Sequence, residues 1–173
     1  MYTERYRLRM SVIKLALYLL LILLAFVAQF LMPPLFIWNV RPLLLVAAAV
    51  VIAMFAGPHT GGFAGFVCGL MCDWISSYTI TYYTVTLMLA GIVIGIIADY
   101  SMRKTLLSAY FLAIIVLVTV QTLFVTLFLL IYKRADIWAL VRVTMPEILY
   151  SLALLPLLYF PARSVFRKTL IKR

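Results

Sequence analysis

Acidic residues and histidines are scarce in this sequence. Its 173 residues include five Asp or Glu and one histidine, His59, against 15 Lys or Arg. Metal centres need several ligands that converge on one point, and acid–base catalysis needs paired titratable groups. Phosphate-binding glycine loops and a nucleophile elbow are also missing. We therefore expect no catalytic residues, no metal and no cofactor, and we expect the protein not to be an enzyme.

Cysteine is equally scarce. Cys68 and Cys72 stand four residues apart inside an apolar run. On a helix this spacing suits neither a disulfide nor the C-x2-C pattern of a metal site. We expect two small apolar thiols packed within a helix.

Charge of either sign is low, and apolar residues are abundant. Charged residues make up 12% of the chain and hydrophobic residues 67%, whereas soluble domains average about 25% and about 45–50%. A net charge of +10 would suggest nucleic acid in a soluble protein. Here the Lys and Arg residues lie between apolar runs, where they orient a membrane protein. The composition predicts an integral membrane protein that binds no nucleic acid.

Several uncharged runs approach the length of about 20 residues that a helix needs to cross a bilayer core. The first is too long for a signal peptide and more runs follow, so we interpret it as a retained signal anchor. Pro33-Pro34 ends it, and Thr144-Met145-Pro146-Glu147 resembles a capping box that begins a helix. The sequence predicts one all-α integral membrane domain, a polytopic bundle of about six transmembrane helices. The expected spans are 15–31, 43–56, 61–76, 82–98, 105–132 and 145–160.

Basic residues give the expected orientation of these spans. With six spans, both termini share one side with eleven basic residues: Arg5, Arg7, Arg9, Lys14, Arg103, Lys104, Arg163, Arg167, Lys168, Lys172 and Arg173. The other side has four: Arg41, Lys133, Arg134 and Arg142. Because positive charge prefers the cytoplasm, we expect both termini in the cytoplasm, with the chain in a bacterial inner membrane. A re-entrant hairpin formed by the second and third spans remains an alternative.

Two ladders of glycines end in aspartate. Gly61, Gly65, Gly69 and Asp73 follow one another every four residues, and so do Gly91, Gly95 and Asp99. Each ladder lies along one helix face, where small residues let backbones approach closely within a membrane. We therefore expect the third and fourth spans to form the packed centre of the bundle. Asp73, the only acid expected well inside a span, should point into the bundle toward Arg41, Tyr82 or Tyr83, and Asp99 should pair with Arg103.

The segments 65–74 and 91–100 also echo each other while running in opposite directions across the membrane. Transporters contain inverted repeats of this kind. Chance similarity within a restricted apolar alphabet is the other interpretation, and the sequence leaves both open.

Residues 41–100 resemble the rod shape-determining protein MreD family. The resemblance rests on Arg41-Pro42 before the second span, then on Gly65-Phe66, Gly69-Leu70 and Asp73. Family members often have a glycine about eight residues after this aspartate, where this chain has Thr81, so the turn there is expected to differ. The resemblance implies a non-enzymatic membrane scaffold that helps organise side-wall peptidoglycan synthesis and maintains rod shape.

The resemblance also implies partners: a bitopic MreC-like protein and, in a wider complex, MreB, RodA and a penicillin-binding transpeptidase. We expect the Gly61, Gly65 and Gly69 face, or a neighbouring span, to receive the single helix of the MreC-like partner. The basic C-terminal tail would contact anionic lipid or a cytoplasmic partner, or would only anchor the topology.

A rival interpretation is the substrate-binding component of an energy-coupled vitamin transporter. Such a protein needs a polar pocket that opens to the outside. Gln29 and Gln121 are the only amides expected well inside the spans. We therefore expect no small-molecule substrate.

Overall fold

The computed structural model describes residues 2–31, 42–76, 82–100, 105–132 and 137–170, all of which are helical apart from short turns. No strand occurs in these ranges, so the all-α prediction is confirmed for them. The six helices are α1 (Tyr2–Leu31), α2 (Leu44–Ala56), α3 (Pro58–Ser76), α4 (Tyr82–Tyr100), α5 (Leu106–Tyr132) and α6 (Ile137–Leu170).

Four helices contain segments long and apolar enough to cross a membrane. These segments are Lys14–Leu31, Tyr82–Tyr100, Leu106–Leu127 and Thr144–Ser164. The chain is therefore a membrane protein. α2 has 13 residues, about 20 Å of helix, which is shorter than a bilayer core. Six complete crossings thus stay a prediction.

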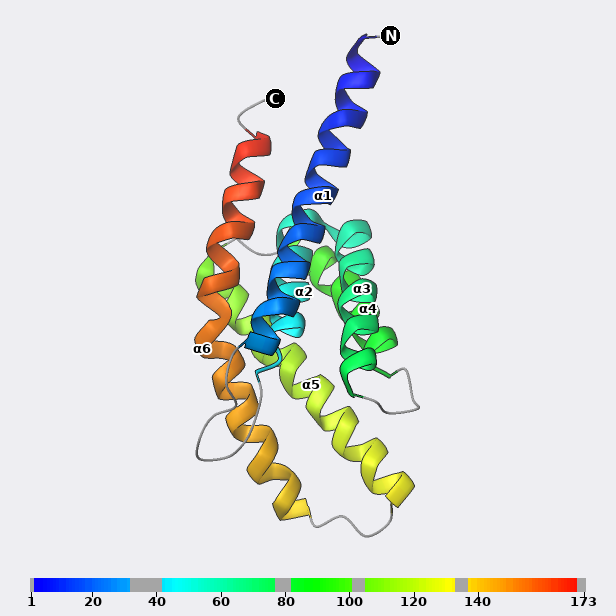
Figure 1. Ribbon diagram of the computed structural model, residues 1–173, viewed down its shortest axis with the longest axis vertical. Helices are drawn as coiled ribbons and strands as arrows, with labels where there is room; N and C mark the ends of the chain where they lie inside the picture. Colours follow the sequence, from blue (N-terminus) through cyan, green and yellow to red (C-terminus); the bar gives the residue numbers. More distant parts are fainter. Residues whose placement is uncertain (1, 32–41, 77–81, 101–104, 133–136, 171–173) are drawn as a thin grey trace.

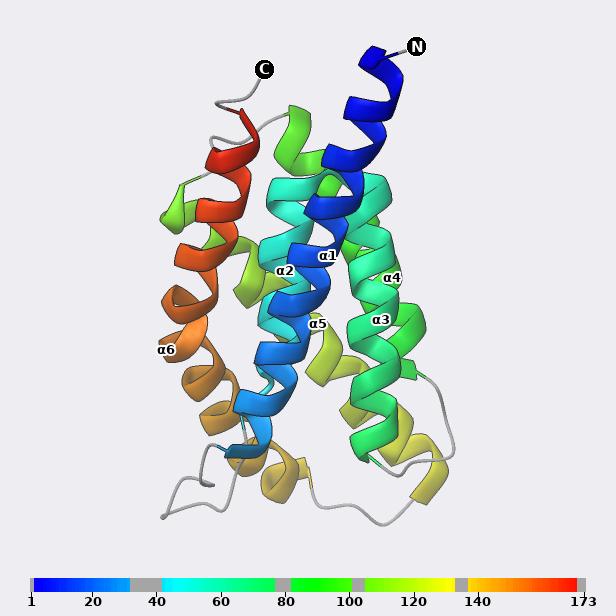
Figure 2. The same cartoon turned by 45° about the horizontal axis from the view of Figure 1, so that its top comes forward.

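The helices form a bundle in which α1 begins and α6 ends at the same end (Figure 1). α5 runs obliquely to the other helices in this view. Turning the bundle shows α2 enclosed, with α6 on one side of it, α3 and α4 on the other and α1 passing in front (Figure 2). α2 contacts all five other helices.

The centre of the bundle is α2, not the α3–α4 pair that the glycine ladders predict. No residue from Leu44 to Phe55 exposes more than 3% of its surface. α3 and α4 each keep an exposed apolar face, which includes Phe63, Phe66, Val85 and Val93. α2 is apolar on every side and rich in alanine and valine, so neighbouring helices approach it from all directions.

The bounds of α2 to α5 agree closely with the expected spans, whereas the two outer helices are longer. α1 already begins at Tyr2, ahead of the apolar run. α6 begins at Ile137 and continues through Pro146, Pro156 and Pro161. The capping box predicted at Thr144–Glu147 is therefore wrong. The connection that the expected spans 105–132 and 145–160 leave between them is also helical from Ile137 onward. Proline is tolerated within transmembrane helices where neighbouring helices and hydroxyl side chains satisfy the freed backbone groups.

Candidate functional site

The glycine ladders of α3 and α4 meet each other. A Cβ atom on Gly61 would lie 2.7 Å from the Gly91 carbonyl oxygen, whereas real Cβ atoms keep at least 3.0 Å from such neighbours. A Cβ on Gly65 would overlap the Leu87 carbonyl, and one on Gly69 would overlap the Thr84 backbone. Backbone therefore touches backbone along this contact, as expected for small residues at this spacing.

The contact is reciprocal. A Cβ on Gly91 would overlap the Gly61 carbonyl, and one on Gly95 would overlap the backbone of Pro58. The two ladders thus pack antiparallel. The similar segments 65–74 and 91–100 supply the two sides of this helix–helix contact. The face formed by Gly61, Gly65 and Gly69 is covered by α4.

Asp73 caps the start of α4. Its Oδ1 accepts a hydrogen bond from the Tyr83 backbone N–H at 3.2 Å, and its Oδ2 accepts one from the Thr84 N–H at 2.9 Å. The Thr84 hydroxyl also donates to Oδ2. These amides have no partner within α4, and the helix dipole places positive potential there. Of the expected partners, Tyr83 is confirmed through its backbone, while Arg41 lies outside the described residues.

Asp99 occupies a corresponding place at the end of the second ladder. It is exposed, and its Oδ2 lies 3.2 Å from the position of a Cβ on Gly57, immediately before α3. Gly57 has φ +86°, which favours glycine because a side chain would be strained there. Each ladder therefore ends in an aspartate near the start of the opposite helix. The expected partner Arg103 lies outside the described residues, and Pro42 of the Arg41-Pro42 pair is buried.

A second polar cluster, which sequence reasoning missed, surrounds the start of α2. The Gln29 Oε1 of α1 accepts from the Leu45 N–H at 3.2 Å. The Ser151 hydroxyl of α6 accepts from the Leu43 N–H at 2.8 Å and donates to the Glu147 carbonyl at 2.7 Å. Side chains from two other helices thus cap the buried beginning of α2.

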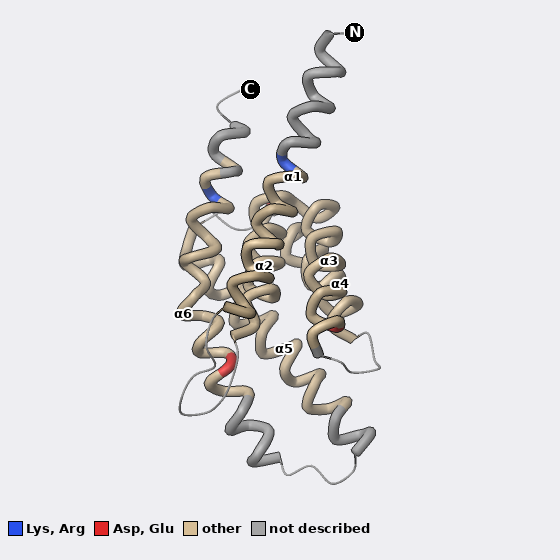
Figure 3. The backbone as a smooth tube through the Cα atoms, viewed as in Figure 1, with Lys and Arg blue, Asp and Glu red and all other residues tan. Residues whose placement is uncertain are grey.

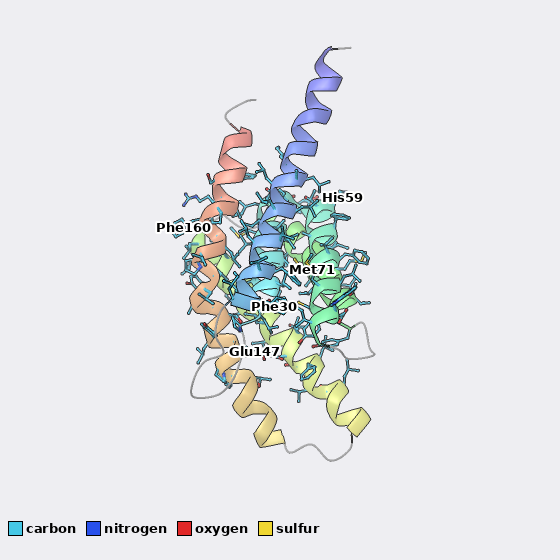
Figure 4. The ribbon with its side chains drawn as sticks, in the orientation of Figure 1. Phe30, His59, Met71, Glu147 and Phe160 are labelled. Atoms are coloured by element: carbon cyan, nitrogen blue, oxygen red, sulfur yellow. The ribbon has the colours of Figure 1, made fainter. Side chains whose placement is uncertain are left out.

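Glu147 belongs to this cluster and is a second partly buried acid, near the start of the candidate span Thr144–Ser164. Its carboxylate accepts from the Nε2 of Gln121, which is almost fully buried on α5. Figure 4 shows Glu147 on the lower part of α6, beside α5. The sequence did not predict this contact, because the capping-box pattern Thr144–Pro146–Glu147 suggested a helix start, and a helix start would place Glu147 near water. One feature of the sequence could have indicated a polar partner for α5: its uncharged run contains a single amide, Gln121.

The remaining cysteine, tyrosine and possible metal-ligating side chains in the described ranges do not converge on a common site. Cys68 and Cys72 are buried and form no disulfide. Within the described ranges, no three His, Cys, Asp or Glu residues come close enough to hold a metal ion. The Tyr82 hydroxyl is buried and has no hydrogen-bond partner there, and its ring stacks against Tyr83 at 4.1 Å. Apart from the Ser151–Glu147 hydrogen bond within α6, the polar contacts described for both clusters link different helices or the segment just before α2.

Comparison of the chain with known protein families, with curated proteins and with solved structures finds no match.

Proposed function

We propose that this chain is a non-enzymatic scaffold of the bacterial cell-elongation machinery, which helps organise side-wall peptidoglycan synthesis and maintains rod shape. It would lie in the inner membrane with both termini in the cytoplasm. The proposal follows from the resemblance of residues 41–100 to the MreD family. One observation carries it: the residues of the resembling motif, Gly65, Gly69 and Asp73, together join α3 to α4.

The proposed partner is a bitopic MreC-like protein, with MreB, RodA and a penicillin-binding transpeptidase in a wider complex. α4 covers the Gly61, Gly65 and Gly69 face. A partner helix could pack on that face only if α3 and α4 separated. We therefore favour the other expectation, that a neighbouring helix receives the partner.

The rival function, vitamin binding, gains little support from the polar groups inside the bundle. A ligand pocket needs side chains whose hydrogen-bonding groups are free to converge on a ligand. The Gln29 amide oxygen already accepts from the α2 backbone, and the Gln121 amide nitrogen donates to Glu147. Both amides thus serve contacts between helices.

Depletion of the protein in its native host tests the scaffold proposal. We expect rods to become spheres, and a tagged copy to co-purify with the MreC-like protein. An unchanged copy of the gene should restore rod shape, which controls for the method of expression. Unchanged morphology together with a nutrient requirement would overturn the proposal and favour the vitamin transporter. Thermal stabilisation by a vitamin, without any elongation partner, would count against it in the same way.

A further inference from the structure

Two basic side chains mark one end of the bundle. Lys14 on α1 and Arg163 on α6 are half-buried, and Figure 3 shows the basic positions of these helices toward the end where the chain begins and finishes. Toward the middle of each helix, the side chain next to the cation is apolar and exposed: Leu15 beside Lys14, and Phe160 one turn before Arg163. The two charges therefore lie at the ends of the candidate spans Lys14–Leu31 and Thr144–Ser164, where lipid headgroups are expected.

Arg163 is held in place by an aromatic cluster. Its guanidinium carbon lies 5.9 Å from the centre of the Tyr159 ring. Tyr159 is fully buried and packs against Phe55 of α2 at 5.5 Å, and Phe55 packs against Phe166 at 5.4 Å. A cation–π contact of this length leaves guanidinium N–H donors available to an anion.

Neither cation has an acidic partner among the side chains that the structure describes. A half-buried cation at the edge of a bilayer is stabilised by an anion, and the nearest abundant anions are headgroup phosphates. The sequence adds Arg5, Arg7 and Arg9 to α1, and Arg167 and Lys168 to α6.

We propose that this end of the bundle binds anionic phospholipids of the surrounding leaflet, with the Arg163 guanidinium as the fixed phosphate contact and Lys14 as a second. This lipid site does not depend on the proposed scaffold function.

Native mass spectrometry of the purified full-length chain, titrated with phosphatidylglycerol in detergent, tests the site. We expect Arg163→Gln and Lys14→Gln each to weaken binding of the first lipid about fivefold, the effect of one basic residue near an anionic surface. Arg163→Lys keeps the charge and should lose less than Arg163→Gln. The control is Lys133→Gln with Arg134→Gln, which removes two charges from the connection between α5 and α6.

Three results would each overturn the proposal. One is equal weakening in the control. Another is equally tight binding of zwitterionic phosphatidylcholine. The third is displacement of the lipid by excess inorganic phosphate, which would indicate a simple anion site. Thermal unfolding of every variant shows whether it is folded, and the Arg163→Lys comparison still decides the question if Arg163→Gln unfolds.

Discussion

Asp73 shows how one residue can join two helices in a membrane. Its carboxylate accepts from two backbone amides and one hydroxyl of α4. These bonds are part-buried, so water does not fully replace them when they are lost. These contacts direct the Asp73 carboxylate toward the start of α4.

We expect Asp73→Leu to lower the free energy of unfolding by about 2–3 kcal/mol, because the amides of Tyr83 and Thr84 lose their acceptor. Asp73→Asn should cost less, since its amide oxygen still accepts one of these bonds. Equilibrium unfolding of the purified protein in mixed micelles with increasing SDS measures both. Leu70→Ala, on the exposed side of α3, serves as the control. An Asp73→Leu protein as stable as the wild type would contradict the capping role.

The glycine contact allows a similar test with a closely matched control. We expect Gly65→Ala to cost about 1–3 kcal/mol, because its methyl group would overlap the Leu87 carbonyl and push the helices apart. Gly62→Ala should cost less, since its methyl group would meet the side chain of Ile92, which can move. Thermal unfolding followed by circular dichroism compares the two. Equal losses would show that backbone contact is not what limits this position.

At the scale of elements, α2 depends on its neighbours more than any other helix. It is short and buried, and two of its first amides are bonded to side chains of α1 and α6. An unsatisfied amide at such a buried helix start would be costly. α1 and α6 therefore hold α2 in register through Gln29 and Ser151, as well as packing against it.

We expect Ser151→Ala to destabilise the bundle by about 1–2 kcal/mol and to speed hydrogen exchange at the start of α2, because the Leu43 amide loses its acceptor. Ser164→Ala removes an exposed hydroxyl from the same helix and is the control. Exchange measured by mass spectrometry on peptides that cover residues 42–50 reports the effect. Unchanged exchange in Ser151→Ala would mean that this bond does not protect the helix start.

At the scale of the whole molecule, the order of the helices determines which ends share a side. α1 begins and α6 ends at the same end of the bundle (Figure 1). His59 and Trp74 are exposed near opposite ends of α3. If α2 and α3 cross the membrane completely, these two residues face opposite aqueous phases.

Thiol labelling tests this topology. In a protein carrying Cys68→Ala and Cys72→Ala, we expect Trp74→Cys to react with an impermeant reagent in intact cells. His59→Cys should react only after the membrane is opened, because its side faces the cytoplasm under the positive-inside rule. Labelling of His59→Cys in intact cells would refute that orientation. Labelling of Trp74→Cys in intact cells, with no labelling of His59→Cys even after the membrane is opened, would favour the re-entrant hairpin.

The sequence by itself determined the helical membrane character of the chain, the approximate bounds of α2 to α5 and the close approach at the glycine ladders. These features follow from local composition and spacing: apolar runs require lipid, and glycines every four residues share one helix face.

Only the tertiary structure decided that α2 is the centre, that Gln29 and Ser151 cap it and that Glu147 pairs with Gln121. These contacts join residues far apart in the chain, and no spacing within one helix encodes them. An apolar helix looks the same in the sequence whether lipid or protein surrounds it, because both are apolar environments. The burial of α2 and the continuation of α6 through Pro146 therefore appear only when the helices are packed together.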